Sequence, residues 1–145
     1  MSVQTPDHHD AELALRVYDL RRETVMREAR AAIIQKFWPK AWEDVQAVLK
    51  GDHPLNAAYR QVNTYWEMVY GMVKHRVVHP EFFMESNGEG LFLFARVEPY
   101  LEALRRDVSP VAYQNAEWVS RETTRGKLQL ELFRGRVRKV LESQK

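Results

Sequence analysis

The feature that most constrains this chain is a row of apolar residues at helical spacing near its middle. Between residues 54 and 75 they recur at steps of three and four, namely Leu55, Tyr59, Val62, Trp66, Val69 and Val73. Such spacing places them on one face of an α-helix, whereas a β-strand requires alternation. No segment of the 145 residues alternates convincingly over the length of a strand. We therefore expect an all-α protein with residues 54–75 as its central helix.

Six prolines divide the chain, and most of them stand where a helix would begin. Proline is favoured at the first helical position, because the N–H that it lacks would have no partner there. Pro99 instead lies inside a helical pattern from Leu91 to about Arg106, which it must kink or split. We predict one domain, residues 1–145, that forms an irregular helical bundle of about five to seven helices with long N- and C-terminal helices. Residues 1–5 are expected to be disordered.

The N-terminal helix is predicted to run from about Pro6 to Phe37, a length of about 45 Å. Its main apolar stripe contains Ala11, Ala14, Leu15, Tyr18, Val25, Met26, Ala29, Ile33 and Phe37. A second stripe on another face contains Leu13, Val17 and Leu20. A surface helix usually needs only one apolar face. Either the second stripe binds a partner, or the bundle covers both.

The C-terminal section is helical and basic. A helical pattern runs from Pro110 to about Glu122 and resumes at Leu128, and between them Gly126 weakens the helix, so residues 110–143 form one helix or two. Leu128, Leu132, Val137 and Leu141 look like a packing stripe. The densest positive charge lies at Arg134, Arg136, Arg138 and Lys139. These four could contact nucleic-acid phosphates, although cations near a helix C-terminus also suit the helix dipole.

Two histidines four residues apart, His75 and His79, are followed by Glu81 and are the candidate metal ligands of this chain. Histidines one helical turn apart can bind a metal together. Here Pro80 follows His79 directly and disfavours the helical conformation at that residue. We therefore interpret the segment as the end of one helix and the start of another, with Glu81 in the first helical turn. A metal-dependent enzyme at His75, His79 and Glu81 remains a third hypothesis.

Other chemistry is limited by what the sequence lacks. There is no cysteine, which excludes disulfides, thiolate metal sites and cysteine nucleophiles. There is no Gly-rich phosphate loop and no Gly-x-Ser-x-Gly elbow. Glu67, within YWEMVY, is the carboxylate to consider for catalysis, because its aromatic neighbours could desolvate it and raise its pKa. Its position off the main stripe instead favours a solvated or hydrogen-bonded structural role. We expect no cofactor.

The segments YRQVNTYWEMVYGMVKHRVVHPEFF and LFARVEPYLEALRR resemble a family of bacterial all-helical domains of unknown function. The shared pattern is the Trp66–Glu67 pair, the helix to His75, the acid-led short helix at Glu81, and Pro99 before a helix that ends in arginine. The resemblance covers about residues 29–119. It implies the helical fold and supplies no activity or site residues. Relatives often carry an N-terminal membrane helix, which we do not find in this sequence, and we expect no membrane insertion.

The sequence thus favours a non-catalytic protein-interaction or self-associating module, with Leu13, Val17 and Leu20 as candidate contacts and a protein partner or a second copy as the ligand. The alternative is a nucleic-acid-binding protein that uses the basic C-terminal helix. The polar N-terminus and the absence of cysteine lead us to expect a cytoplasmic location.

Overall fold

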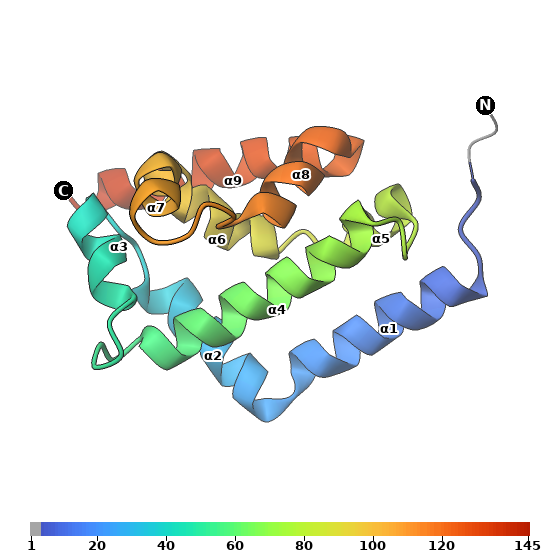
Figure 1. Cartoon of the computed structure of the whole chain (residues 1–145), viewed down its shortest axis with the longest axis horizontal. Coiled ribbons are helices and arrows are strands. Elements are labelled where there is room, and N and C mark those ends of the chain that lie inside the picture. Colours follow the sequence, from blue (N-terminus) through green and yellow to red (C-terminus); the bar gives the residue numbers. More distant parts are fainter. Residues whose placement is uncertain (1–3) are drawn as a thin grey trace.

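The computed structural model describes residues 4–145, and this part of the chain is built from helices without any strand (Figure 1). The helices are α1 (His8–Arg22), α2 (Thr24–Lys36), α3 (Trp42–Val48), α4 (Asn56–Lys74), α5 (Pro80–Ser86), α6 (Gly90–Val97), α7 (Leu101–Asp107), α8 (Gln114–Glu122) and α9 (Thr124–Ser143), with a 3₁₀ turn at Glu98–Tyr100. The all-α prediction is confirmed. The division is finer than the expected five to seven helices, chiefly because the predicted first helix is broken.

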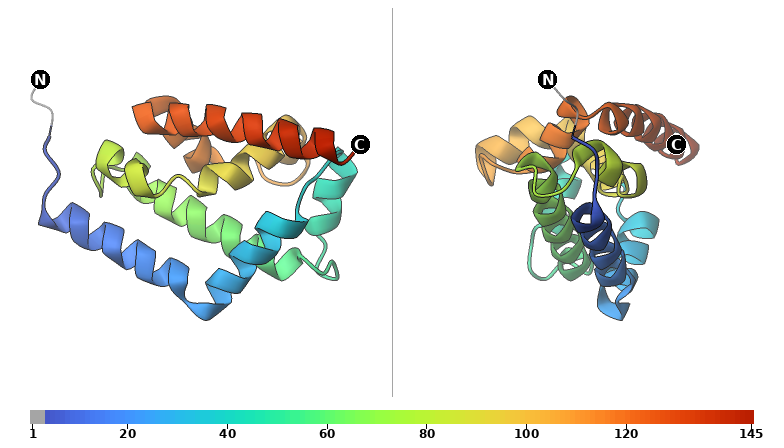
Figure 2. Two further views of the ribbon diagram at one scale, coloured as in Figure 1. Left: turned by 180° about the vertical axis from the view of Figure 1, so that it is seen from behind. Right: turned by 90° about the vertical axis from the view of Figure 1, so that its right-hand side faces the viewer.

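Helix α4 occupies the centre of the bundle, as its apolar stripe predicts (Figure 1). On one side α1 and α2 form a V, and on the other lie α6, α8 and α9 (Figures 1 and 2). Tyr59, Val62, Trp66, Val69 and Val73 are all buried, and only Leu55 at the start of the stripe is half-buried. The contact between α4 and its neighbours therefore forms the hydrophobic core.

The predicted helix Pro6–Phe37 is wrong, because the chain turns at Glu23 and continues as α2. Glu23 has an extended ψ of 144°, and its carboxylate accepts a hydrogen bond from the Met26 N–H, 3.1 Å away. Glu23 thus acts as the N-cap of α2. Neither proline nor glycine marks this break in the sequence. The turn sets α1 at an angle to α2, and α2 packs on α4 (Figure 2).

Pro99 splits its segment as expected: α6 ends at Val97, and α7 begins at Leu101 after the 3₁₀ turn. Residues 110–143 form two helices, of which α8 starts only at Gln114 rather than near Pro110. The break between α8 and α9 lies at Thr123, whose hydroxyl accepts a hydrogen bond from the Gly126 N–H at 2.9 Å and caps α9. Gly126 itself is helical, so its low helix propensity does not make the break.

The C-terminus of α4 is closed by a residue in the left-handed region. Arg76 has a φ of 56°, and the following Val77 N–H donates to the Met72 carbonyl at 2.9 Å, an arrangement typical of helix ends that favour glycine.

We expect Arg76→Gly to stabilise the protein by about 0.5–1 kcal/mol, because glycine adopts this conformation without the strain of a Cβ atom. The matched control is Lys74→Gly, two residues earlier in helical conformation, which should cost about 1 kcal/mol. Urea unfolding of the two variants measures both changes. A loss of stability in Arg76→Gly would show that the arginine side chain contributes more than the strain costs.

The expected disorder of residues 1–5 falls partly on residues 1–3, which lie outside the described residues. Gln4 and Thr5 are described and are not helical. The Gln4 carbonyl accepts a hydrogen bond from the His79 ring at 2.7 Å, so the described N-terminus runs toward the start of α5.

Candidate functional site

The structure separates the two histidines of the candidate metal site. His75 is the exposed C-cap of α4, and His79 is the half-buried N-cap of α5. The Nδ1 atom of His79 accepts from the Phe82 N–H at 3.1 Å, so its Nε2 atom must donate to the Gln4 carbonyl. Both ring nitrogens are thus engaged in neutral-imidazole hydrogen bonds. Within residues 4–145, no group of three or more histidine, aspartate or glutamate side chains is arranged to hold a metal ion.

Glu81 binds the beginning of another helix. Its two carboxylate oxygens accept from the backbone N–H groups of Thr124 and Arg125, at 2.9 and 3.1 Å. These amides open α9, where the helix dipole favours a negative charge. The sequence placed Glu81 correctly in the first turn of its own helix, but could not show that it caps a helix 43 residues further along the chain.

Glu81→Ala is expected to cost about 1 kcal/mol of stability, because two amides of α9 lose their charged acceptor. Since the role requires no metal, the loss should be the same with and without EDTA. The exposed Glu85 on the same helix provides the control, and Glu85→Ala should change stability by about 0.5 kcal/mol or less. If the loss of stability in Glu81→Ala depended on the chelator, the result would support a metal site at Glu81.

Asp10 is a buried carboxylate in the first turn of α1. One of its oxygens accepts from the Asp7 N–H at 2.9 Å, and the other accepts from the His79 N–H at 2.7 Å. These backbone donors lower the pKa of the Asp10 carboxyl. Asp10 therefore joins the start of α1 to the start of α5. The pairing between Asp7 and Asp10 is a capping box that the spacing could have revealed.

Glu67 is a hydrogen-bonded structural residue, as its position predicts. Its Oε1 accepts from the Ala116 N–H at 2.8 Å and its Oε2 accepts from the Asn115 N–H at 3.2 Å, so the carboxylate of α4 caps α8. Burial raises the pKa of Glu67 above its ordinary value of 4.5, and the two amides oppose this rise.

The raised pKa of Glu67 predicts a pH dependence. The folded protein binds its proton more tightly than the unfolded chain, so this group's contribution to stability falls as pH rises from below 4.5 through the folded pKa. The free energy of unfolding of wild type, relative to Glu67→Gln, should therefore decrease from mildly acidic to neutral pH. A relative increase over the same range would mean that the amides outweigh burial.

The basic C-terminal candidates are not equivalent. Arg134 binds Glu98 through Nε and Nη2, at 2.8 and 2.5 Å, and also pairs with Glu131 on its own helix. Arg136, Arg138 and Lys139 are exposed. The guanidinium of Arg136 lies 5.5 Å from the centroid of the Phe133 ring. Arg134 is therefore paired with acidic side chains of the fold. The other three cations of the predicted cluster remain at the surface.

The apolar stripe predicted for α9 also needs correction. Leu130, Phe133 and Val137 are buried, whereas Leu128 and Leu132 are 52% and 53% exposed. The one-residue link at Thr123 sets the rotation of α9 about its axis, and this rotation cannot be derived from the spacing of leucines alone.

Neither of the two stripes predicted for the N-terminal helix coincides with the buried side of α1. Val17 is buried, its carbonyl accepts from the Tyr65 hydroxyl at 2.6 Å, and Leu13 packs partly against the core. Of the predicted interaction residues only Leu20 is exposed. Leu15 and Tyr18, assigned to the main stripe, are 65% and 44% exposed. The break at Glu23 is the reason, because α1 need not continue the inward face of α2.

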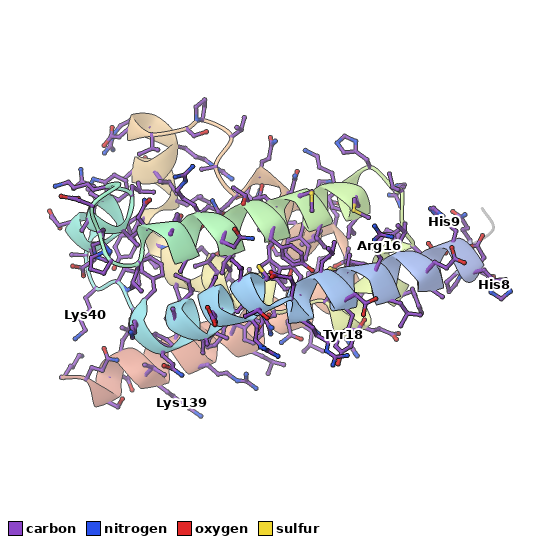
Figure 3. All side chains as sticks on the ribbon, turned by 90° about the horizontal axis from the view of Figure 1, so that it is seen from below. His8, His9, Arg16, Tyr18, Lys40 and Lys139 are labelled. Carbon is purple, nitrogen blue, oxygen red and sulfur yellow. The ribbon has the colours of Figure 1, made fainter. Side chains whose placement is uncertain are left out.

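Helix α1 thus presents an outward side that no other element of residues 4–145 covers. Figure 3 views α1 and α2 on the near side of the molecule, with Arg16 and Tyr18 projecting to either side of α1. We define the outer face of α1 as Glu12, Leu15, Tyr18, Asp19 and Arg22, all of which are exposed. They follow one another at helical steps and therefore share one side of the helix. Beyond the turn, Val25 of α2 is 58% exposed as well.

The arginines beside Tyr18 complete this surface. The guanidinium carbons of Arg21 and Arg22 lie 5.3 and 5.2 Å from the centroid of the Tyr18 ring, within the range of a cation–π contact. An exposed aromatic ring next to arginine is a combination enriched at protein–protein contacts.

Residues 4–145 thus form an all-helical fold. The chain belongs to a family described as a domain of unknown function, DUF4760, whose profile matches residues 6–123. The resemblance expected for residues 29–119 is confirmed and extends further on both sides, but α9 lies outside the match. No curated protein and no solved structure matches the chain. None of the helices that the structure describes is long and apolar enough to cross a membrane.

Proposed function

We propose that this protein is a non-catalytic interaction module that binds a second copy of itself through the outer face of α1. The observation that carries the proposal is the pair of exposed side chains Leu15 and Tyr18, flanked by charges of opposite sign. Exposed apolar groups that lie together are typical of interaction sites, whereas isolated ones are common on any protein. A cytoplasmic location belongs to the same proposal and is supported by the lack of cysteine.

Charge complementarity favours a second copy as the partner. Glu12 lies three residues before Leu15, and Arg22 lies four residues after Tyr18. In an antiparallel pair of α1 helices related by a twofold axis, Leu15 of each copy meets Tyr18 of the other, and Glu12 faces Arg22. The surface is limited to one helix face and its surroundings, so we expect a weak, concentration-dependent dimer.

Cross-linking tests the proposal, because the chain has no cysteine of its own. A Leu15→Cys variant treated with a short bis-maleimide should give covalent dimers in a yield that rises with protein concentration. Leu128→Cys on α9, at a similarly exposed position, is the matched control and should remain largely monomeric.

Charge reversal then identifies the pairing. Arg22→Glu in the Leu15→Cys background should suppress the cross-link, and adding Glu12→Arg should restore it, since both twofold-related contacts regain opposite charges. Equal cross-linking of the Leu15→Cys and Leu128→Cys variants, or no rescue by the second reversal, would contradict an antiparallel α1 interface.

A further inference from the structure

Helix α9 is apolar on two opposite sides. Its inner side buries Leu130, Phe133 and Val137 in the hydrophobic core. Leu128 and Leu132 lie one helical turn apart on the outward side, where both are exposed. A helix that packs on a core needs only one apolar face. The packing of α9 within the fold therefore does not account for these two leucines.

Exposed cations extend this pair of leucines in both directions along α9. Arg125 precedes Leu128 by three residues, and Arg136 and Lys139 follow Leu132 by four and seven residues. With a rotation of about 100° per residue, these five side chains fall within an arc of about 80° on one side of the helix. We define the outer face of α9 as Arg125, Leu128, Leu132, Arg136 and Lys139.

The fold does not balance the positive charge of this face. Within residues 4–145, none of its three cations forms an ion pair with a carboxylate, whereas Arg30 and Arg134 each bind a glutamate of another helix or turn. Of the two glutamates in α9, Glu131 is paired with Arg134 and Glu142 is exposed. The outer face of α9 therefore offers unpaired cations on either side of an apolar centre.

The position of α9 makes this face accessible to a large partner. The helix has 20 residues and is about 30 Å long. It runs along one edge of the molecule, with the other helices on its inner side (Figure 2). Lys139 projects away from the body of the protein (Figure 3). A flat partner can therefore contact the outer face of α9 from outside the bundle.

Leucines between cations suit a membrane surface that carries anionic lipids. At such a surface, leucine side chains enter the boundary of the acyl chains, while arginine and lysine reach the lipid phosphates. Nucleic-acid phosphates would bind the cations but leave the leucines in water. A second copy of the same face would bring like charges together, in contrast to the outer face of α1, which carries both signs.

We propose that the outer face of α9 binds the surface of membranes that contain anionic phospholipids, with the helix parallel to the bilayer. Leu128 and Leu132 make a shallow apolar contact, and Arg125, Arg136 and Lys139 bind the phosphates. Each cation near an anionic surface strengthens binding by about fivefold. The helix lies on the bilayer and does not cross it. The proposal is independent of self-association through α1.

Flotation of the full-length protein with lipid vesicles tests the proposal. Wild type should float with vesicles of equimolar phosphatidylserine and phosphatidylcholine, and should stay behind with vesicles of phosphatidylcholine alone. Binding to the anionic vesicles should fall as the salt concentration rises, because salt screens the attraction. No flotation with the anionic vesicles, or equal flotation with both kinds, would overturn the proposal.

Variants at exposed positions separate the apolar contact from the charge. Leu128→Ser combined with Leu132→Ser should weaken binding to the anionic vesicles by about tenfold, because the apolar contact is lost. Met68→Ser, at a comparably exposed position of α4, is the matched control and should bind like wild type. If the double leucine variant binds like wild type, the contact is adsorption by charge alone and the proposed face is wrong.

Neutralising two cations then tests the orientation of the helix. Arg136→Gln combined with Lys139→Gln should weaken binding by about 25-fold, since each cation contributes about fivefold. Arg60→Gln on α4 is the matched control and should have no effect. An equal loss in Arg60→Gln would contradict docking through α9. A single-stranded oligonucleotide that binds wild type and the double leucine variant equally, without vesicle binding, would assign the cations to nucleic acid instead.

Discussion

Replacing Gly126 by alanine is expected to destabilise this protein by about 3 kcal/mol, although alanine is normally the better helix former by about 1 kcal/mol. Gly126 lies in the first turn of α9, where a Cβ atom would approach the Val119 carbonyl oxygen to 2.1 Å and the Thr123 hydroxyl to 2.5 Å. The Val119 carbonyl belongs to α8 and accepts from the Thr123 hydroxyl at 2.6 Å. Relief of the clash therefore requires the two helices to separate.

Gly135, later in the same helix, is the matched control. The nearest atom that its added Cβ would meet is Nη2 of Arg138 at 3.8 Å, an ordinary contact. Gly135→Ala should therefore stabilise the protein by about 0.5–1 kcal/mol. Urea unfolding of both variants measures the two changes. If both substitutions stabilise, Gly126 does not lie in close contact with the Val119 carbonyl.

Glu67→Ala should produce the second large effect, a loss of about 2–3 kcal/mol, because two amides at the start of α8 lose a charged acceptor within the fold. Tyr113, the N-cap of α8, has a φ of 57° and provides no side-chain cap of its own. The capping of Ala116 and Asn115 by a side chain therefore comes from Glu67 of another helix.

Glu67→Gln separates the hydrogen bonds from the packing, because the amide keeps the shape but has only one acceptor oxygen. It should cost about half as much as Glu67→Ala. Chemical unfolding at constant pH gives both values. If Glu67→Ala unfolds like wild type, the α4 carboxylate does not hold α8.

Local sequence patterns predicted the parts of the fold that depend on neighbouring residues. The stripe of α4 is strongly periodic, and its residues are buried as expected. Pro80 correctly indicated that His79 ends one segment and caps the next. The break at Glu23 could not be predicted in this way, because neither a proline nor a glycine marks it. Once the break was missed, Leu15 and Tyr18 were assigned to the inward face of α1, although both are exposed.

Contacts between distant residues were beyond the sequence for a different reason. Glu67 and Glu81 each cap a helix more than 40 residues away, and Arg96 closes the end of α2 from a position 59 and 63 residues later. The spacing of residues indicates whether a charged side chain lies near the core, but its hydrogen-bond partner depends on how the helices pack. Single residues that suggested chemistry, such as Glu81 and Arg134, therefore proved to hold elements of the fold together.

The outer face of α1 has no role within the fold that these contacts reveal. It combines apolar exposure with charges that suit an antiparallel second copy, and it lies on a helix of which only Asp10 and Val17 are fully buried. We infer that α1 contacts the rest of the fold with one side, where the Tyr65 hydroxyl of α4 donates to the Val17 carbonyl, and binds a partner with the other.

Sedimentation velocity over a wide range of protein concentration tests this central claim most directly. We predict that wild type shifts from monomer toward dimer as concentration rises, that Tyr18→Glu remains monomeric, and that Met68→Glu, at a comparably exposed site on α4, dimerises like wild type. A wild-type protein that stays monomeric at the highest concentration, or a Tyr18→Glu variant that dimerises equally well, would contradict the account.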